Sequence, residues 1–258
     1  MVTTNGVATG ASSFLATIAW RTNPRARTYT ALVQIKVVSA VGTVAGLSDI
    51  INAHCASSGR AAGPTSAAGQ AWSGKITFTN SVGKGRRHVS NALFVSTPVL
   101  ASGGSSSAGG GRSSTTVRCD DELGSQRPGC VLNAVTPTVS MAGLPKIAKN
   151  IRGIQTRGGY GVPGDHQRAL HRITRKASIT GNRRAVCARK ITGPPPKPKM
   201  SCDEYPFAST KEGGTALSGM HRGWAWVPIG EQSSQGGILS SFYQDQRVLN
   251  DDAFWVKV

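Results

Sequence analysis

The chain has few acidic residues and no long apolar run. Only 12 of its 258 residues are Asp or Glu, against 30 Lys and Arg, so the formal net charge is +18. No segment approaches the roughly 20 consecutive apolar residues that a membrane-spanning helix needs, which excludes a transmembrane span of that kind. A protein with this charge is attracted to polyanions by a salt-sensitive force that does not depend on their sequence. The composition therefore favours an acidic partner, without indicating what happens after contact.

The start of the chain lacks the marks of a signal peptide. Its mildly apolar segment, SSFLATIAW at residues 12–20, has no basic residue before it. We therefore expect that the chain either follows a processed leader or is part of something longer.

Cysteines are few, and their spacing matches no zinc motif. There are five, with no CxxC or Cys/His pattern. The intervals from Cys119 to Cys130 and from Cys187 to Cys202 are short enough for each pair to close a small loop. Two such disulfides would indicate an oxidising compartment and a secreted, extracellular protein, with Cys55 left over. The alternative is five free thiols in a reducing compartment.

Residues 1–150 are rich in strand signals. TYTALVQIKVVSA, KITFTN and NALFVSTPVL alternate or run apolar with β-branched residues, which is typical of strands in a sandwich. The tracts 57–74 and 101–114 are rich in Gly, Ser and Ala without an apolar period, so we expect long loops there. We interpret residues 1–150 as a β-rich, Gly/Ser-looped accessory domain of sandwich type and residues 151–258 as a second domain.

The segment 166–190 contains no Asp or Glu and carries a strongly basic surface. We expect a helix through roughly residue 178, with Leu170, Ile173 and Ala177 on its apolar face. A solvated surface helix is the plain alternative to a polyanion-binding role. The cations that we expect to contact a nucleic acid backbone are Arg172, Arg175, Lys176, Arg183 and Arg184.

A hairpin followed by a helix is expected after residue 200. The strand DEYPF alternates, so Asp203 and Glu204 face opposite sides. WAWVP is the second strand. EQSSQGGILSSFYQ then starts a helix whose apolar stripe is Ile238, Leu239 and Phe242. The small unit is therefore predicted to be β-β-α.

This unit holds groups suited to the hydrolysis of a phosphodiester bond. The reaction needs a deprotonated and aligned water, neutralised phosphoryl oxygens and a stabilised leaving group. One carboxylate, one hard cation and one arginine can supply them. Carboxylate and carboxamide oxygens suit Mg²⁺ or Mn²⁺, which usually keep several waters. Asp203 would be the base, and the candidate metal ligands are Glu231, Gln232 and Gln235.

Several spaced motifs resemble the NucA/NucB deoxyribonuclease family of secreted bacterial nucleases. They occur in the family's order over about residues 165–257, as LHRIT, NRRAVC, CDEYPFAST, EQSSQGG, RVL and DAFWV. The resemblance implies a ββα-metal fold, endonucleolytic cleavage of DNA without marked sequence preference, and an aspartate base that falls on Asp203. Gln232 stands where the family pattern has Asn beside the acid. Arg222 is assigned to the catalytic site by its position alone.

Other residues have ordinary structural alternatives. Glu204 either joins the catalytic site or pairs with an arginine that holds its strand. We expect His171 to be structural, whereas His221 is positioned to compete as a base, although no His–Asn–His spacing accompanies it. Trp224 and Trp226 alternate on a strand, and we expect them to pack in the core instead of stacking on bases.

The sequence thus predicts an α+β protein, with a β-sandwich-like domain followed by a small ββα-metal nuclease domain. In this interpretation a bond between Cys187 and Cys202 fixes the base relative to the phosphate-binding surface. Two other functions remain open. The same nuclease could be a toxin domain delivered to competitors and neutralised by an immunity or inhibitor protein, or the unit could be a catalytically silent DNA-binding protein.

Overall fold

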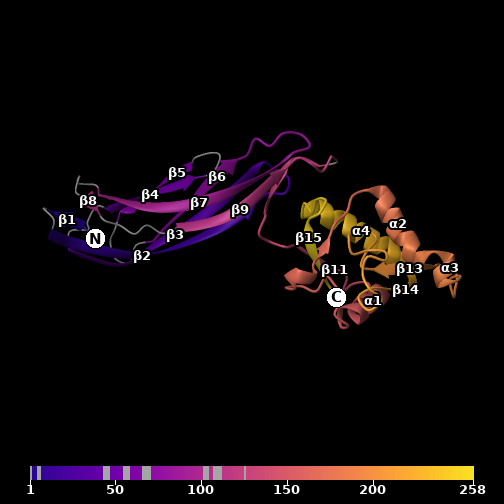
Figure 1. Cartoon of the computed structure of the whole chain (residues 1–258). Helices are drawn as coiled ribbons and strands as arrows, with labels where there is room; N and C mark the ends of the chain where they lie inside the picture. The colour runs from indigo at the N-terminus through magenta and orange to yellow at the C-terminus, as the bar shows by residue number, and fades with distance from the viewer. Residues whose placement is uncertain are drawn as a thin grey trace. The chain divides into compact units, whose positions relative to one another are not determined.

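The chain divides into two compact units, Met1–Ala134 and Val135–Val258 (Figure 1). The computed structural model describes residues 2–4, 7–42, 47–54, 59–65, 71–100, 105–106, 112–124 and 126–258, so Cys55 lies outside the described residues. Both strands and helices are present, which confirms the α+β class. In the part of the chain that is described, no helix has the length and apolar character needed to cross a membrane.

The N-terminal unit is built from two five-stranded sheets whose described strands pair antiparallel. Their strand orders are β6-β3-β2-β1-β8 and β10-β9-β7-β4-β5. The strands are β1 (Val2–Thr4), β2 (Val7–Thr22), β3 (Thr28–Gly42), β4 (Leu47–His54), β5 (Gly59–Thr65), β6 (Ala71–Thr79), β7 (Arg87–Leu100), β8 (Ser105–Ser106), β9 (Arg112–Asp120) and β10 (Gly129–Leu132).

Residues from both sheets form one buried cluster in this unit. Ala31, Val33 and Ile35 alternate along β3 and are almost fully buried, as a period of two requires. Val117 and Cys119 of β9 belong to the same cluster. The two sheets therefore share a core.

Two predictions for the N-terminal unit have different outcomes. Cys119 on β9 and Cys130 on β10 lie opposite each other and form the predicted disulfide. The long loop expected over 57–74 is wrong, because β5 and the start of β6 occupy much of it. The small residues of β5 give no apolar period, yet the β5 backbone pairs with β4 through hydrogen bonds that need no side chain.

The C-terminal unit combines two small sheets with the helices. The sheets have the orders β11-β15-β12 and β13-β14. The elements are β11 (Thr138–Ser140), α1 (Pro145–Gln155), the 3-10 helix η1 (His166–Arg168), β12 (Leu170–His171), α2 (Lys176–Cys187), α3 (Arg189–Thr192), β13 (Met200–Tyr205), β14 (Gly223–Pro228), α4 (Ile229–Asp245) and β15 (Ala253–Lys257). The expected hairpin and following helix are β13, β14 and α4.

The division between the units lies at residues 134 and 135, before the boundary that the sequence suggested at residue 150. The reason is helix α1, which begins with Pro145 at a position where its missing N–H costs nothing. Its residues Ile147, Ile151 and Ile154 are at most 2% exposed and belong to the core of the C-terminal unit. Helix α1 therefore folds with the elements that follow it.

The α-helix predicted from residue 166 to about residue 178 is wrong as far as Arg175. The chain forms η1, then β12, and becomes α-helical only at Lys176, where α2 begins. Leu170, which the prediction placed on an apolar helix face, is instead buried on β12 opposite Phe254 of β15. Arg172 and Arg175 therefore precede the helix.

Candidate active site

Asp203 and Glu204 point to opposite sides of the β13–β14 hairpin, which confirms the predicted alternation. Asp203 lies opposite Ala225, and Glu204 lies opposite Trp224. The Asp203 side chain contacts α1 and α4, whereas Glu204 contacts α2. The two carboxylates therefore have separate surroundings.

Two amide side chains hold the Asp203 carboxylate. Gln235 of α4 donates from Nε2 to Oδ1 at 2.8 Å, and Asn150 of α1 donates from Nδ2 to Oδ2 at 3.2 Å. Asp203 is 1% exposed. Each oxygen thus has one amide donor, which fixes the orientation of the carboxylate between the two helices.

The surroundings of Asp203 make it a stronger base than an exposed aspartate. Burial raises the pKa of Asp203 to about 6, although the hydrogen bonds from Gln235 and Asn150 lower it. The nearby charge of Glu204 raises this pKa and that of Arg183 lowers it. A carboxylate with a pKa near neutrality can accept a proton in the transition state and release it afterwards.

The two predicted amide ligands differ in what their oxygens do. Gln235 Oε1 accepts a hydrogen bond from Gln232 Nε2 at 3.1 Å, so both ends of the Gln235 amide are engaged. Gln232 Oε1 is buried and has no hydrogen-bond donor among the described residues. A buried carboxamide oxygen without a donor is a group that a hard divalent cation would satisfy. Of these two residues, Gln232 fits the role of metal ligand and Gln235 positions Asp203.

Glu231 stabilises the start of helix α1. Its Oε2 accepts from the backbone N–H groups of Lys146 and Ile147 at 2.9 and 3.1 Å. Helix α1 has no side-chain cap of its own, and a negative charge is favourable at a helix N-terminus. One oxygen of this predicted metal ligand is therefore already engaged in holding α1 beside the hairpin.

Glu204 is held by an arginine, the alternative that the sequence left open. Arg183 Nη1 donates to its Oε2 at 2.9 Å, and Arg183 Nη2 donates to the Cys202 carbonyl at 3.0 Å. Burial raises the pKa of Glu204 while Arg183 lowers it. The pair therefore ties α2 to β13.

The predicted disulfide between Cys187 and Cys202 is present, with the Cα atoms 5.8 Å apart. Their sulfurs and Glu204 place possible ligand atoms within 4.8 Å of one another. Because both sulfurs belong to the disulfide, they provide no thiolate for an ion. The bond joins the end of α2 to the residue before Asp203.

Arg222 lies in the loop before β14 and makes no hydrogen bond to Asp203 among the described contacts. Its Nε donates to the Leu217 carbonyl at 2.9 Å. The structure thus orders this arginine at the hairpin end without bringing it to the carboxylate.

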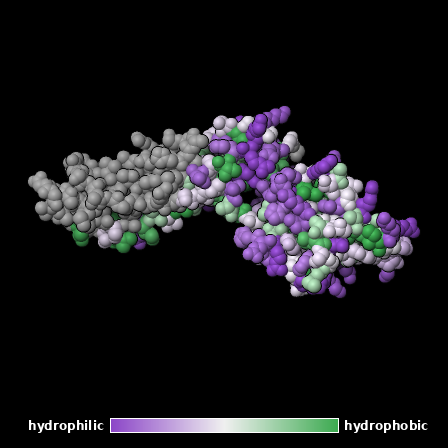
Figure 2. All heavy atoms as spheres, in the orientation of Figure 1, coloured by the Kyte–Doolittle hydropathy of each residue, from purple (hydrophilic) through white to green (hydrophobic). Residues whose placement is uncertain are grey.

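The five cations predicted to bind DNA fall into two groups. Arg183 is paired with Glu204, and the Arg172 guanidinium lies 4.4 Å from the centre of the Tyr243 ring and donates to the Val248 carbonyl. Burial lowers the pKa of Arg172. The other three, Arg175, Lys176 and Arg184, have no ion-pair partner in the described part of the chain. Figure 2 shows that hydrophilic residues predominate on the visible face of the C-terminal unit.

The remaining expectations concern the roles of two histidines and the packing of two tryptophans. His171 is paired with Glu212 through Nδ1 at 2.8 Å, as expected for a structural histidine. His221 Nδ1 is buried without a described partner. The expectation of core packing is wrong for Trp224, which is 36% exposed. Its ring is edge-on to that of Trp226, with the ring centres 5.9 Å apart.

Asn150 is the functional candidate that sequence reasoning missed. It lies on α1 between the core residues Ile147 and Ile151, and this spacing in the sequence could have identified it. Isoleucines at 147, 151 and 154 after Pro145 have helical spacing, and a polar amide beside such a stripe faces the protein interior. No motif marks Asn150.

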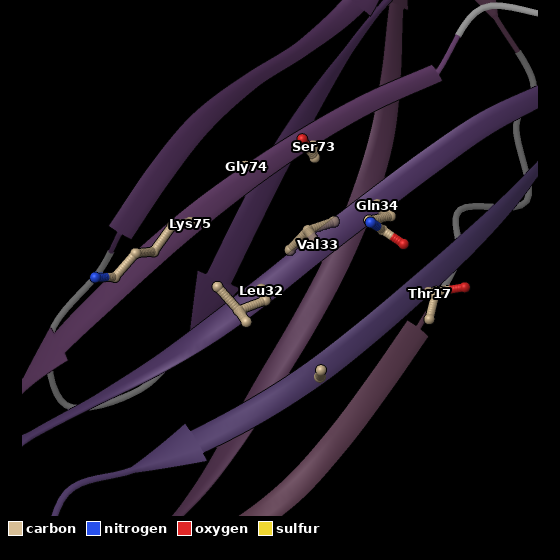
Figure 3. A pocket seen from close by; sticks show the side chains of 8 residues that line it. Thr17, Leu32, Val33, Gln34, Ser73, Gly74 and Lys75 are labelled. Atoms are coloured by element: carbon tan, nitrogen blue, oxygen red, sulfur yellow. The ribbon is translucent and has the colours of Figure 1, made fainter.

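The N-terminal unit has a hollow of about 520 Å³ on strands β2, β3 and β6. Thr17, Leu32, Gln34, Ser73 and Lys75 are among the residues that line it (Figure 3). No acidic residue or histidine is among its lining residues. We therefore assign no chemistry to it.

The C-terminal unit is thus basic and holds a buried carboxylate on the β13–β14 hairpin. Residues 159–257 match the family model described as Deoxyribonuclease NucA/NucB, so the C-terminal region carries a domain of this deoxyribonuclease family. The comparisons with curated proteins and with solved structures found no match. Helix α1, which supplies Asn150, lies before the matched residues.

Proposed function

We propose that the C-terminal unit is a divalent-metal-dependent endonuclease that hydrolyses DNA without sequence preference, and that the protein is secreted. The observation that carries this proposal is the buried Asp203 carboxylate, oriented by two amides and with a pKa of about 6. The family match to residues 159–257 supports DNA as the substrate, and the two disulfides are consistent with an oxidising compartment.

The arrangement of elements supports finer assignments of the fold. The β13–β14 hairpin followed directly by α4 is consistent with a ββα-metal domain. Two antiparallel sheets that share one core are consistent with a β-sandwich in the N-terminal unit, which we regard as an accessory domain.

Asp203 acts as the general base in this proposal. Its carboxylate accepts the proton of the attacking water, while Asn150 and Gln235 keep the two oxygens in a fixed orientation. Such positioning lowers the barrier because less motion is needed in the transition state. Glu204 contributes indirectly, since its pair with Arg183 holds β13 against α2.

The donor set fits one hard cation, Mg²⁺ or Mn²⁺. Gln232 would hold it through its unpaired oxygen, with the adjacent Glu231 as a second candidate. When bound, the ion would supply positive charge to the phosphoryl oxygens. Arg222 is the proposed arginine for the departing oxygen. Exposed Arg175 and Lys176, together with Arg184, would bind the DNA backbone.

Plasmid nicking by the full chain tests this function. We expect cutting with Mg²⁺ or Mn²⁺ and none with a chelator. Asp203→Asn should lower the rate by about two to four orders of magnitude, the usual contribution of a general base. Glu204→Gln is the matched control, because it changes the adjacent carboxyl, and we expect it to affect stability more than the chemical step.

Two results would refute the proposal. One is the absence of cutting with every divalent ion, which would favour a silent DNA-binding protein. The other is equal cutting by the wild type and Asp203→Asn.

A further inference from the structure

A groove of about 470 Å³ runs between helix α1 and strand β14. Helix α1 contributes positions three or four residues apart, which lie on one side of a helix. Strand β14 contributes its first four residues. The residues that line the groove are Lys146, Lys149, Asn150, Gly153, Ile154, Arg157, Gly223, Trp224, Ala225 and Trp226. None of them is acidic, so the groove suits an anionic ligand.

The helix side of the groove carries a row of cations. Lys146 and Lys149 are exposed and have no ion-pair partner in the described part of the chain. They lie about 4.5 Å apart along the helix axis at a rise of 1.5 Å per residue, and Arg157 follows the end of α1 at Gln155. Together with Arg157, these cations can contact phosphates of one extended strand.

The strand side offers an aromatic surface. Trp224 is 36% exposed and contacts Trp226 edge-on, so part of its indole remains open to a ligand. A base stacks on an aromatic side chain only when it has left its own stack, as in a single strand. A row of cations beside an open indole therefore matches an unpaired strand better than a duplex.

The groove reaches one hydrogen-bond partner of the buried Asp203 carboxylate. Asn150 lines the groove and donates to Asp203 Oδ2 at 3.2 Å. We propose that this α1–β14 groove binds an unpaired DNA strand, with phosphates along Lys146, Lys149 and Arg157 and a base stacked on Trp224. The inference rests on the proposed nuclease function and extends it to the form of the substrate.

Binding without cleavage separates the two proposals. The full chain carrying Asp203→Asn, in chelator, is titrated into fluorescein-labelled 15-nucleotide DNA, single-stranded or duplex, and anisotropy is measured. Adding Trp224→Ala should weaken single-strand binding about tenfold, which is within the range for one stacked base, and change duplex binding by less than twofold. Trp224→Phe should restore most of the affinity because it keeps an aromatic face.

The cations are tested through the salt dependence of binding. Replacing Lys146 and Lys149 with Ala should lower the slope of log affinity against log salt by about 1.4, at about 0.7 for each single-strand phosphate. Lys257→Ala removes an exposed cation that does not line the groove and should leave the slope unchanged.

Substitutions of Gly153 on helix α1 give an independent check. A Cβ at Gly153 has 3.8 Å to its nearest neighbour, Arg157 Nη1, so side chains fit there. Gly153→Glu should weaken single-strand binding because it places a carboxylate in the groove, whereas Gly153→Ala should keep the affinity within twofold.

The groove proposal is overturned if Trp224→Ala and Gly153→Glu both bind single strands like the parent, or if duplex binding falls equally. Unchanged binding together with normal plasmid cutting would remove the groove assignment alone. Groove-dependent binding by a chain that cuts no DNA would remove the nuclease assignment alone.

Discussion

The protonation of the buried Asp203 carboxyl affects the stability of the fold. Burial raises the pKa of this carboxyl from 3.8 to about 6, so the folded chain binds the proton more tightly than the unfolded chain. The resulting stabilisation is fully present below pH 3.8 and is lost as the pH rises through about 6. At about 1.4 kcal/mol for each pKa unit, the loss amounts to about 3 kcal/mol. Solvent screens little of this electrostatic contribution to the free energy of unfolding, because Asp203 is 1% exposed.

The substitution Asp203→Asn isolates this effect. The new amide still contacts Asn150 and Gln235, but it turns one N–H toward a donor, which costs about 1–3 kcal/mol at every pH. Only the titration differs between variant and wild type as the pH changes. From pH 4.5 to pH 8 we therefore expect the difference in unfolding free energy to move by about 2 kcal/mol in favour of the variant.

Urea unfolding of the full chain, followed by tryptophan fluorescence with chelator present, measures this difference. Chelator is needed because a bound cation would itself favour the ionised carboxylate. In a parallel assay, plasmid cutting by the wild type should rise with pH and level off once Asp203 is ionised. A difference in unfolding free energy that stays constant from pH 4.5 to pH 8 would refute the reasoning.

Three further substitutions test the supports of the site. Asn150→Ala should lower kcat about tenfold. It should also move the rising limb of the pH–rate profile to higher pH, because the hydrogen bond from Asn150 lowers the pKa of Asp203 and its removal raises that pKa. An unshifted profile would contradict the positioning role. Glu231→Gln should lower the free energy of unfolding by about 1 kcal/mol, measured in urea, because α1 loses a charge at its N-terminus; an unchanged midpoint would count against this contact. Replacing Cys187 and Cys202 together by Ser should destabilise the unit by about 3 kcal/mol and reduce cutting, and a nuclease indifferent to the change would show that the disulfide does not position β13.

Local features of the site could be predicted from the sequence. The opposite orientations of Asp203 and Glu204 follow from strand alternation, and the stripe of Leu239 and Phe242 follows from helical spacing. The pairing of Cys187 with Cys202 follows from their short separation. In each case the determining residues are neighbours in the chain, so the pattern contains the information.

Features that depend on distant contacts were not predictable in the same way. Leu170 has the spacing of a helix stripe, but pairing with Phe254 makes it part of a strand. Trp224 has the hydrophobicity of a core residue, yet it is partly exposed on β14. Glu231 caps the start of α1 from 85 residues away in the chain, and no sequence pattern in either segment predicts this contact. Tertiary packing decides these positions, not local propensity.

Helix α1 extends the functional unit beyond the residues that carry the family motifs. The matched region begins at residue 159, but the Asp203 carboxylate depends on Asn150 for one of its two amide donors. The same helix is held at its start by Glu231, which lies beside Gln232 on α4. A shift of α1 would therefore move a donor of the base and a neighbour of the proposed ion ligand together. Because Asp203, its two amides and this cap form one connected set of contacts, the unit that positions the proposed base includes α1.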